Sequence, residues 1–535
     1  MAFNIADIFE RAVDLMPERM AISCGADRRT FAELDARANQ AAHGLAARGI
    51  GPGDHVGIYA PNCIEWMETM LGCFKLRAVP VNVNFRYVED ELVYIFDNAD
   101  LVAVVYDPEF SARLETIAPQ LPGLSHRIAI GEEYEAALAA ASAERDFPER
   151  SGDDLYVLYT GGTTGMPKGV MWRHEDVFMA LGQGIDAVTG HQVEADDELA
   201  RKGAANPAGI IMLMTPPLMH GAAQWGILGQ LFQGNSIVLL PRFSGEAVWD
   251  LVEQERVNAV LIAGDAMGRP MIESYEAGGP DRWDVSSLFA LSSSAALFSV
   301  PVKERFFAAF PNLIVTDSIG SSEGGFNGIS TIGKDNPSGG SSGGLPRVAP
   351  MADVIVVDDD MQPLTPGDGR VGKVARGGNI PLGYHKDPEK TAKTFLTGPE
   401  GRRYVVAGDF ARWEEDGSIT LLGRGSVCIN SGGEKVFPEE VETALKSHAA
   451  VYDALVVGVP DERWGSAVTA VVQPRDGAEP TLDELSSHCR TKVAGYKVPR
   501  HLVLVDSIVR SPAGKPDYPW ATKLAAERLA DTAVP

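Results

Sequence analysis

The sequence is poor in the features that mark several special protein classes. Only 5 of its 535 residues are cysteine, and none has CxxC spacing, which excludes a disulfide framework and a cysteine zinc site. We therefore expect reduced thiols and a cytoplasmic protein. No run of 18 uncharged apolar residues occurs, and the first residues lack the order of a signal peptide, so we expect no transmembrane helix.

Positive charge is also scarce. The 47 lysines and arginines are outnumbered by 73 aspartates and glutamates, which gives a net charge of −26. Such a field repels nucleic acids and anionic membranes, so we expect no nucleic acid as a partner and no generic binding to an anionic membrane. Association with a membrane through a lipophilic substrate stays open, and an anionic ligand needs a locally basic site. The remaining composition, 45% hydrophobic and 22% charged, is that of a globular protein. The length suggests about three to four folding units.

Alternating helical patterns and short apolar runs predict α/β layers over most of the chain. Helical spacing runs through residues 31–48, and strand patterns occur at 55–59, 101–106 and 259–263. This alternation favours mostly parallel strands. After about residue 350, short strands joined by Gly- and Asp-rich turns indicate a small β-rich subdomain.

The last part of the chain has the pattern of a separate α+β unit. Its first helix begins at Pro438, where proline suits the first turn and the following glutamates suit the helix dipole. Two strands and a second helix follow, at residues 453–459, 467–472 and 481–493. A unit of about 110 residues is a common domain size. We place its boundary near Gly423–Arg424.

The most informative stretch, residues 159–169, reads YTGGTTGMPKG and follows a predicted strand at 155–158. Its glycines let the backbone approach a ligand closely, its threonines supply hydroxyl groups, and Lys168 supplies a positive charge. These groups suit a polyphosphate. The stretch is not a Walker A loop, because Pro167 precedes the lysine and Gly169 follows it, so the kinase and GTPase interpretations lose their main support.

These eleven residues resemble the phosphate-binding signature YTSGTTGxPKG of the adenylate-forming superfamily, which contains acyl-CoA synthetases, adenylation domains and luciferases. Further motifs follow in the family's order over nearly the whole chain. The resemblance implies a large N-terminal domain of layered α/β subdomains with a β-rich subdomain (1–423) and a small mobile α+β C-terminal domain (424–535). It also implies nucleotide binding by Thr160, Gly161, Gly162, Thr163, Thr164, Gly165 and Lys168.

Two further segments resemble the family's adenine-side motifs. Residues 291–297 (LSSSAAL) are similar to SGGAxL, and residues 317–323 (DSIGSSE) are similar to GYGxTE, with Ile319 in place of the tyrosine that packs on adenine. Glu323 falls on the family's Mg²⁺-associated glutamate, with Thr164 as a second metal residue. The implied nucleotide-binding residues are Ser294, Ala295, Ala296, Asp317, Ser318, Ile319, Gly320, Ser321 and Ser322.

The C-terminal motifs complete the resemblance. Asp409, in a YxTGD-like segment, and Arg424 are expected on the ribose, and Gly433 is expected to line the pantetheine tunnel of CoA. Lys515, in a PxxxxGK-like segment, is expected to bridge the substrate carboxylate and the α-phosphate. His220, in a PxxHxxG-like segment, is expected near the acyl carboxylate, either as a gate or acting on a proton.

The resemblance implies an ATP-dependent acid–CoA ligase. A carboxylate attacks the α-phosphate of ATP to give an acyl-adenylate and pyrophosphate, and the thiol of CoA then displaces AMP. The implied cofactors are ATP, Mg²⁺ and CoA, and the implied catalytic residues are Lys515, Glu323, Thr164 and His220. The family rotates the C-terminal domain between the two steps, because Lys515 and Gly433 lie on that domain but serve different steps.

The amino-acid sequence of several segments, such as GRGSVCIN at 423–430 and RSPAGKPDY at 510–518, resembles that of CoA ligases for steroid side-chain and other bulky or long acids. An ordinary medium- or long-chain fatty acyl-CoA synthetase is the alternative. Transfer to a carrier protein is disfavoured because no carrier domain is visible, and a non-catalytic nucleotide-binding scaffold is disfavoured because the motif residues occur together. The sequence leaves the oligomeric state open, a homodimer included.

Overall fold

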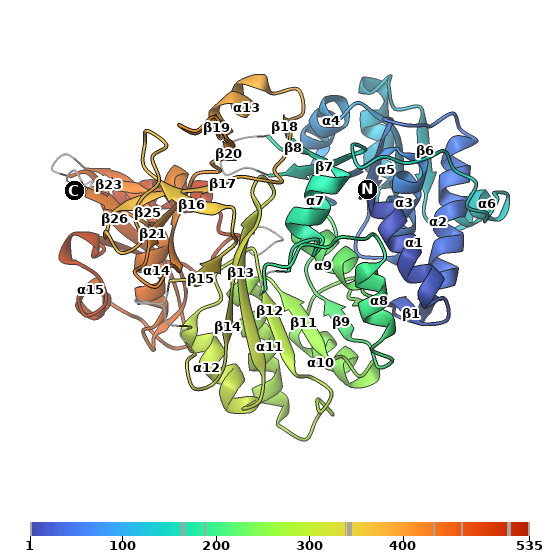
Figure 1. Cartoon of the computed structure of the whole chain (residues 1–535). Helices are drawn as coiled ribbons and strands as arrows, with labels where there is room; N and C mark the ends of the chain where they lie inside the picture. Colours follow the sequence, from blue (N-terminus) through green and yellow to red (C-terminus); the bar gives the residue numbers. More distant parts are fainter. Residues whose placement is uncertain are drawn as a thin grey trace.

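The structure is a computed structural model that describes residues 3–161, 166–186, 189–337, 339, 345–431, 434–461, 464–510 and 515–532. Two large β-sheets with helices packed on them form most of the chain, and smaller sheets follow near the C-terminus (Figure 1). This layered arrangement confirms the predicted α/β plus α+β fold.

The first sheet has seven strands in the order β18-β8-β7-β4-β3-β5-β6. The five strands from β7 to β6 are parallel, whereas β8 and β18 add antiparallel strands at the edge. The strands are β3 (His55–Tyr59), β4 (Val79–Asn82), β5 (Leu101–Tyr106), β6 (His126–Ala129), β7 (Leu155–Thr160), β8 (Lys168–Arg173) and β18 (Gly383–Tyr384). The helices of this part are α1 (Ile5–Leu15), α2 (Phe31–Ala46), α3 (Ile64–Leu76), α4 (Glu89–Asn98), α5 (Ser111–Ile117), α6 (Glu132–Ala139) and α7 (His174–Leu181).

The second sheet has fifteen strands, and those that come first in the chain are largely parallel. These strands are β1 (Met20–Cys24), β2 (Asp27–Thr30), β9 (Ile211–Met214), β10 (Ser236–Leu239), β11 (Ala259–Ile262), β12 (Ala290–Ser293), β13 (Ile314–Ser321), β14 (Gly325–Ile332) and β15 (Arg347–Pro350). The helices that accompany them are α8 (Glu198–Ala204), α9 (Gly221–Phe232), α10 (Gly245–Gln254), α11 (Gly264–Gly278) and α12 (Val300–Ala309).

The β-rich part continues this second sheet, because β15 pairs with both β14 and β22. Its remaining elements are β16 (Val354–Val357), β17 (Val371–Arg376), α13 (Pro388–Thr394), β19 (Phe395–Thr397), β20 (Arg403–Val405), β21 (Asp409–Trp413) and β22 (Ile419–Arg424). The short-strand pattern after residue 350 therefore predicts the elements correctly but not their hydrogen-bonded continuity with the α/β layers.

After Val427, the strands of the described residues pair only among themselves. The elements are β23 (Ile429–Ser431), β24 (Glu434–Val436), α14 (Pro438–Lys446), β25 (Val451–Asp461), β26 (Gly465–Pro474), α15 (Leu482–Arg490), β27 (His501–Leu504) and α16 (Tyr518–Thr532). Helix α14 begins at Pro438, as predicted. The domain boundary at 423/424 stays a prediction.

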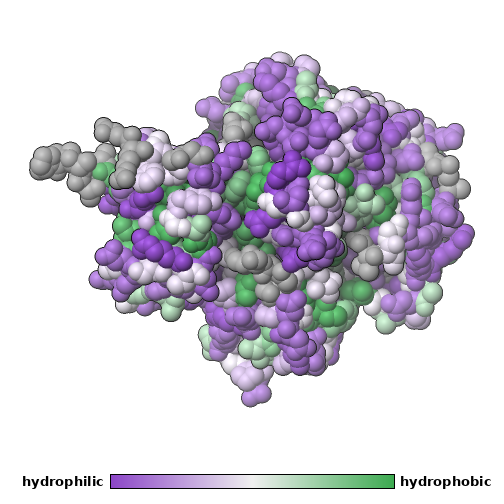
Figure 2. All heavy atoms as spheres, turned by 60° about the vertical axis from the view of Figure 1, so that its left-hand side comes forward, coloured by the Kyte–Doolittle hydropathy of each residue, from purple (hydrophilic) through white to green (hydrophobic). Residues whose placement is uncertain are grey.

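The largest apolar core joins the helices and strands of both sheets. It includes Trp66 of α3, Trp172 of β8 and Phe232 of α9, each less than 2% exposed. Polar side chains cover most of the outer face in Figure 2, and apolar side chains are visible mainly in its recesses. Within the described ranges, no helix is both long enough and apolar enough to cross a bilayer.

Candidate active site

The predicted magnesium residue lies where the two large sheets meet. Glu323 occupies the turn between β13 and β14 and is half-buried. The phenol of Tyr384, on β18 of the first sheet, donates a hydrogen bond of 2.9 Å to its carboxylate. The indole N–H of Trp172, on β8, donates to the Ser322 carbonyl at 3.0 Å. Two strands of the first sheet therefore hold the glutamate-bearing turn of the second.

The predicted phosphate-binding loop lies between β7 and β8. Thr160 ends β7, Lys168 begins β8, and the two residues are register partners. The Lys168 ammonium forms an ion pair with Asp387, which also accepts a hydrogen bond from the Lys390 N–H at the start of α13. Gly161 directly follows β7. The predicted residues Gly162, Thr163, Thr164 and Gly165 lie outside the described residues. Their roles, including Thr164 at the metal, stay predictions.

The predicted adenine-side residues lie on β13, or directly after it or its parallel neighbour β12. Ser294, Ala295 and Ala296 come directly after β12, with Ala295 in the left-handed region at φ 66°. The Ser318 hydroxyl donates to the Ser293 carbonyl at 3.1 Å and so ties the two strands together. Gly320, Ser321 and Ser322 lead into the Glu323 turn, where the Gly324 N–H donates to the Ser321 hydroxyl at 2.8 Å.

Asp317 and Ile319, which belong to the same predicted set, contact an ion-pair partner and an apolar cluster, respectively. The Asp317 carboxylate forms an ion pair with the buried Lys303 of α12. Burial raises the pKa of Asp317, and the positive charge of Lys303 opposes that rise. Ile319 packs against the apolar cluster that includes Ile419. In this arrangement Asp317 and Ile319 support the strand that leads to Glu323.

The predicted ribose-binding residues face each other across two antiparallel strands. Asp409 begins β21 and Arg424 ends β22; they are register partners, and their side chains form an ion pair of 3.2 Å. Burial raises the pKa of Asp409, whereas the guanidinium of Arg424 lowers it. A half-buried carboxylate held by an arginine is fixed in place and retains lone pairs that can accept hydroxyl hydrogen bonds.

Lys515 lies in the same electrostatic cluster although it is far along the chain. Crowding by the surrounding protein and then the positive charge of Arg424 lower the pKa of Lys515, while Glu323 and Asp409 raise it. The residue as a whole is exposed, so solvent reaches Lys515. Four predicted site residues from separate motifs are thereby within electrostatic reach of one another.

His220 precedes α9, and its Nε2 atom is buried without a hydrogen-bond partner in the described part of the chain. Burial, followed by the positive charges of Lys515 and Arg86, lowers the pKa of His220 to about 3. The imidazole is therefore neutral near pH 7. A neutral imidazole can accept a proton or a hydrogen bond but cannot serve as a cationic partner for a carboxylate.

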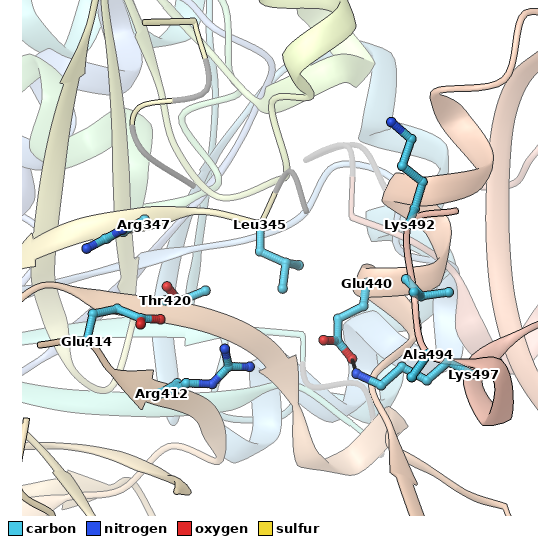
Figure 3. Close-up of a pocket in the computed structure, with 10 residues that line it drawn as sticks. Leu345, Arg347, Arg412, Glu414, Thr420, Glu440, Lys492, Ala494 and Lys497 are labelled. Atoms are coloured by element: carbon cyan, nitrogen blue, oxygen red, sulfur yellow. Dashed lines mark hydrogen bonds and ion pairs between the residues drawn. The ribbon is translucent and has the colours of Figure 1, made fainter. Parts of the chain in front are cut away.

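A cavity of about 330 Å³ lies between the β-rich part and the C-terminal elements. Figure 3 shows Arg412 and Thr420 on one side and Lys492, Ala494 and Lys497 on the other. Among the predicted site residues that the structure describes, none lines it. Gly433, predicted to line the CoA tunnel, lies outside the described residues, so its role stays a prediction.

The comparisons with known proteins agree with this arrangement. The model of the AMP-binding enzyme family matches residues 9–385, and that of the AMP-binding enzyme C-terminal domain matches residues 440–515. The chain belongs to the AMP-binding enzyme family. The resemblance inferred from the motifs is thereby confirmed.

Similar proteins of this family include CoA ligases. A 3-oxocholest-4-en-26-oate–CoA ligase of Rhodococcus rhodochrous is 53% identical over 99% of this chain and 97% of its own length. A medium/long-chain-fatty-acid–CoA/3-oxocholest-4-en-26-oate–CoA ligase of Mycolicibacterium smegmatis is 50% identical over 99% of this chain and 98% of its own length. The structure of an anthranilate CoA ligase with anthranoyl-AMP is similar at a TM-score of 0.86 and 22% identity, over 99% of this chain and 98% of that one. The predicted class, an acid–CoA ligase, is confirmed.

Sequence reasoning missed the residues that support the predicted site. Tyr384 and Asp387 hold Glu323 and Lys168, yet both lie more than 60 positions away from their partners in the sequence. The Asp387–Pro388 pair does signal the start of a helix. No local pattern indicates that its carboxylate contacts a lysine 219 positions away.

Proposed function

We propose that this AMP-binding enzyme activates a steroid side-chain acid, or another bulky or long-chain carboxylic acid, and transfers the acyl group to CoA. The two CoA ligases that share half of its residues act, by their names, on 3-oxocholest-4-en-26-oate, which supports the steroid acid. The name of the second also includes medium- and long-chain fatty acids, so straight-chain acids are the alternative.

The observation that carries the mechanism is the cluster of Lys515, Glu323, Asp409 and Arg424. In the first step, a carboxylate oxygen of the acid bonds to the α-phosphorus of ATP and the bond to pyrophosphate breaks. Negative charge grows on the phosphate oxygens, and a positive group already in place stabilises it without reorganisation. Lys515 is the group that we assign to this task, with Asp409 and Arg424 holding the ribose.

The donor set around Glu323 fits a magnesium ion. Among the described residues, no group of three His, Cys, Asp or Glu side chains forms a complete metal cage. A single carboxylate is nevertheless what Mg²⁺ uses when phosphate oxygens and water supply its other ligands. When bound, Mg²⁺ neutralises charge on the phosphates. Glu323, oriented by Tyr384, and Thr164 are the residues that we assign to it.

In the second step the thiol of CoA attacks the acyl carbonyl carbon and AMP leaves. We assign Gly433 to the pantetheine tunnel, and we place the division at residues 1–423 and 424–535. Rotation of the second part about the residues after Arg424 would withdraw Lys515 and bring Gly433 to the site, a gating motion of domain scale. We assign His220, which is neutral near pH 7, to a position beside the acyl carboxylate. We also assign the protein to the cytoplasm.

The test compares the two half-reactions in Lys515→Ala and in the control Lys523→Ala, which changes an exposed lysine of the same C-terminal region. Removing one stabilising donor costs about 10²–10³ in rate, so we expect ATP–pyrophosphate exchange to fall by that factor in Lys515→Ala alone. A scaffold protein would show no exchange in any variant.

The acid is tested by CoA-dependent AMP formation on a panel of steroid side-chain acids and straight-chain fatty acids. Fastest thioester formation with the steroid acids is the expected result. Preference for straight chains would discard the steroid assignment and keep the mechanism, and pyrophosphate release without thioester would indicate another acyl acceptor.

A further inference from the structure

One aromatic side chain connects the C-terminal elements to helix α11 of the second sheet. Tyr452, on β25, lies with its ring centroid 5.1 Å from the Arg269 guanidinium of α11. The guanidinium of Arg475, which follows β26, lies 5.9 Å from the same ring centroid. Both distances are within the range in which a cation is attracted to the face of an aromatic ring.

A carboxylate of α11 reinforces this contact. Glu273 lies 3.5 Å from the Tyr452 hydroxyl, which donates to it, and 3.9 Å from a nitrogen of Arg475. Arg305 of α12 holds the same carboxylate at 3.3 Å. One carboxylate of the N-terminal part therefore faces a phenol and a guanidinium of the C-terminal part.

The surface that receives Tyr452 is stiff. Arg269 is only 5% exposed, and its guanidinium is paired with Asp265 one helical turn earlier, at 3.3 Å. The Asp265 carboxylate also accepts a hydrogen bond of 2.8 Å from the Ser299 N–H at the start of α12. A cation fixed in this way and withdrawn from water attracts a ring more strongly than an exposed one does.

The contact is present in the orientation in which the charges of Glu323, Asp409 and Arg424 act on Lys515. Tyr452 and Lys515 both belong to the C-terminal elements, whereas Arg269, Glu273 and Glu323 belong to the second sheet and its helices. Any rotation that withdraws Lys515 from the site must therefore move Tyr452 relative to α11.

We propose that Tyr452 is a positioning residue for the first half-reaction: it holds the C-terminal part on α11 in the orientation that delivers Lys515 to the acid and ATP. This inference rests on the proposed function, because it assumes the two half-reactions. A contact made in one orientation favours only the step that uses that orientation. The thioester step does not use it.

The experiment measures the two half-reactions separately in the full-length protein. ATP–pyrophosphate exchange with the best acid reports the first step, and thioester formation from chemically prepared acyl-adenylate and CoA reports the second. In Tyr452→Ala we expect exchange to fall about ten-fold, the loss of a partly desolvated cation–π contact. Thioester formation should stay unchanged or rise, because the Tyr452 contact no longer holds the C-terminal part in the orientation of the first step.

Two more variants separate positioning from folding. Tyr452→Phe keeps the ring between the guanidinium groups and should restore exchange to near the wild-type rate. Glu273→Gln removes the charge that faces Arg475 and should lower exchange about two-fold to three-fold, as expected for an ion pair at the surface. The control Tyr496→Ala changes an exposed tyrosine of the same C-terminal part and should leave the exchange rate as it is.

Equal loss of both half-reactions in Tyr452→Ala would overturn the proposal, since it would indicate a merely structural role. An unchanged exchange rate in Tyr452→Ala would overturn it as well. A wild-type protein that catalyses neither half-reaction would instead refute the proposed function, so the two failures are distinguishable.

Discussion

The hydrogen bond between Tyr384 and Glu323 offers the sharpest test of the candidate site. The Tyr384 side chain is 5% exposed, and its hydroxyl donates to the carboxylate at 2.9 Å. Tyr384→Phe removes this donor and leaves the ring in place. A hydrogen bond to a charged group contributes about 1.5–3 kcal/mol net, and the half-buried carboxylate places this one at the lower end.

If the hydroxyl fixes the carboxylate for magnesium-bound ATP, this energy appears in the reaction. About 1.4 kcal/mol corresponds to a factor of ten in rate, so we expect kcat/KM for MgATP in pyrophosphate exchange to fall about ten-fold. When Mg²⁺ is titrated at fixed ATP, the exchange rate of Tyr384→Phe should reach saturation only at a higher Mg²⁺ concentration than that of the wild type.

Tyr134→Phe is the matched control. Tyr134 is also almost fully buried and also donates to a glutamate, Glu68, at 3.2 Å, but on α6 and α3 of the first part of the chain. Its exchange rate should equal that of the wild type. An unchanged kcat/KM in Tyr384→Phe, or an equal fall in Tyr134→Phe, would refute the reasoning that Tyr384 orients Glu323.

Two stability predictions follow from buried charges of the C-terminal part. Burial and the nearby Glu442 raise the pKa of Glu439, so ionisation of this carboxyl is disfavoured in the folded state. The free energy of unfolding of the wild type therefore falls by about 1.4 kcal/mol per pH unit above the ordinary glutamate pKa, until the folded pKa is reached. Glu439→Gln should therefore gain thermal stability relative to the wild type between pH 5 and pH 8; a difference in Tm that is independent of pH would contradict this. Asp453 pairs with the buried Lys446 at 3.2 Å and with Arg510 at 2.8 Å; burial raises its pKa, but the two cations lower it overall. Asp453→Asn leaves these cations without their counter-charge and should destabilise the fold by about 3–5 kcal/mol in urea unfolding at pH 7. Because the folded pKa is depressed, this deficit should shrink as the pH falls below the ordinary aspartate pKa, and a constant deficit would count against the ion-pair explanation.

Local elements of the fold could be predicted from the sequence because their signals are local. The apolar run at residues 55–59 is strand β3, and proline followed by two glutamates begins α14 at Pro438. Hydrophobic periodicity and helix-start residues depend on neighbours within one or two turns, which the sequence contains directly. The motif residues Glu323, Asp409, Arg424 and Lys515 could likewise be named from short patterns.

The sequence predicted less about how distant segments join. The β-rich part was expected as a subdomain of its own, but β15 connects it to the second sheet by pairing with β14 and β22. Pairing between strands that are far apart depends on backbone hydrogen bonds, and these carry little side-chain identity. The role of Asp317 illustrates the same limit, because its partner Lys303 could be recognised only once α12 lay beside β13.

By itself, the sequence determined the family and the type of chemistry and named the candidate residues for it, because phosphate binding and adenylation need particular groups in short, fixed patterns. Only the tertiary structure decided which charges meet. It places Tyr384 against Glu323 across 61 positions of sequence and Tyr452 against Arg269 across the junction of the two parts. The physical reason is that hydrogen bonds and charge interactions act over a few ångströms in space, whatever the distance along the chain.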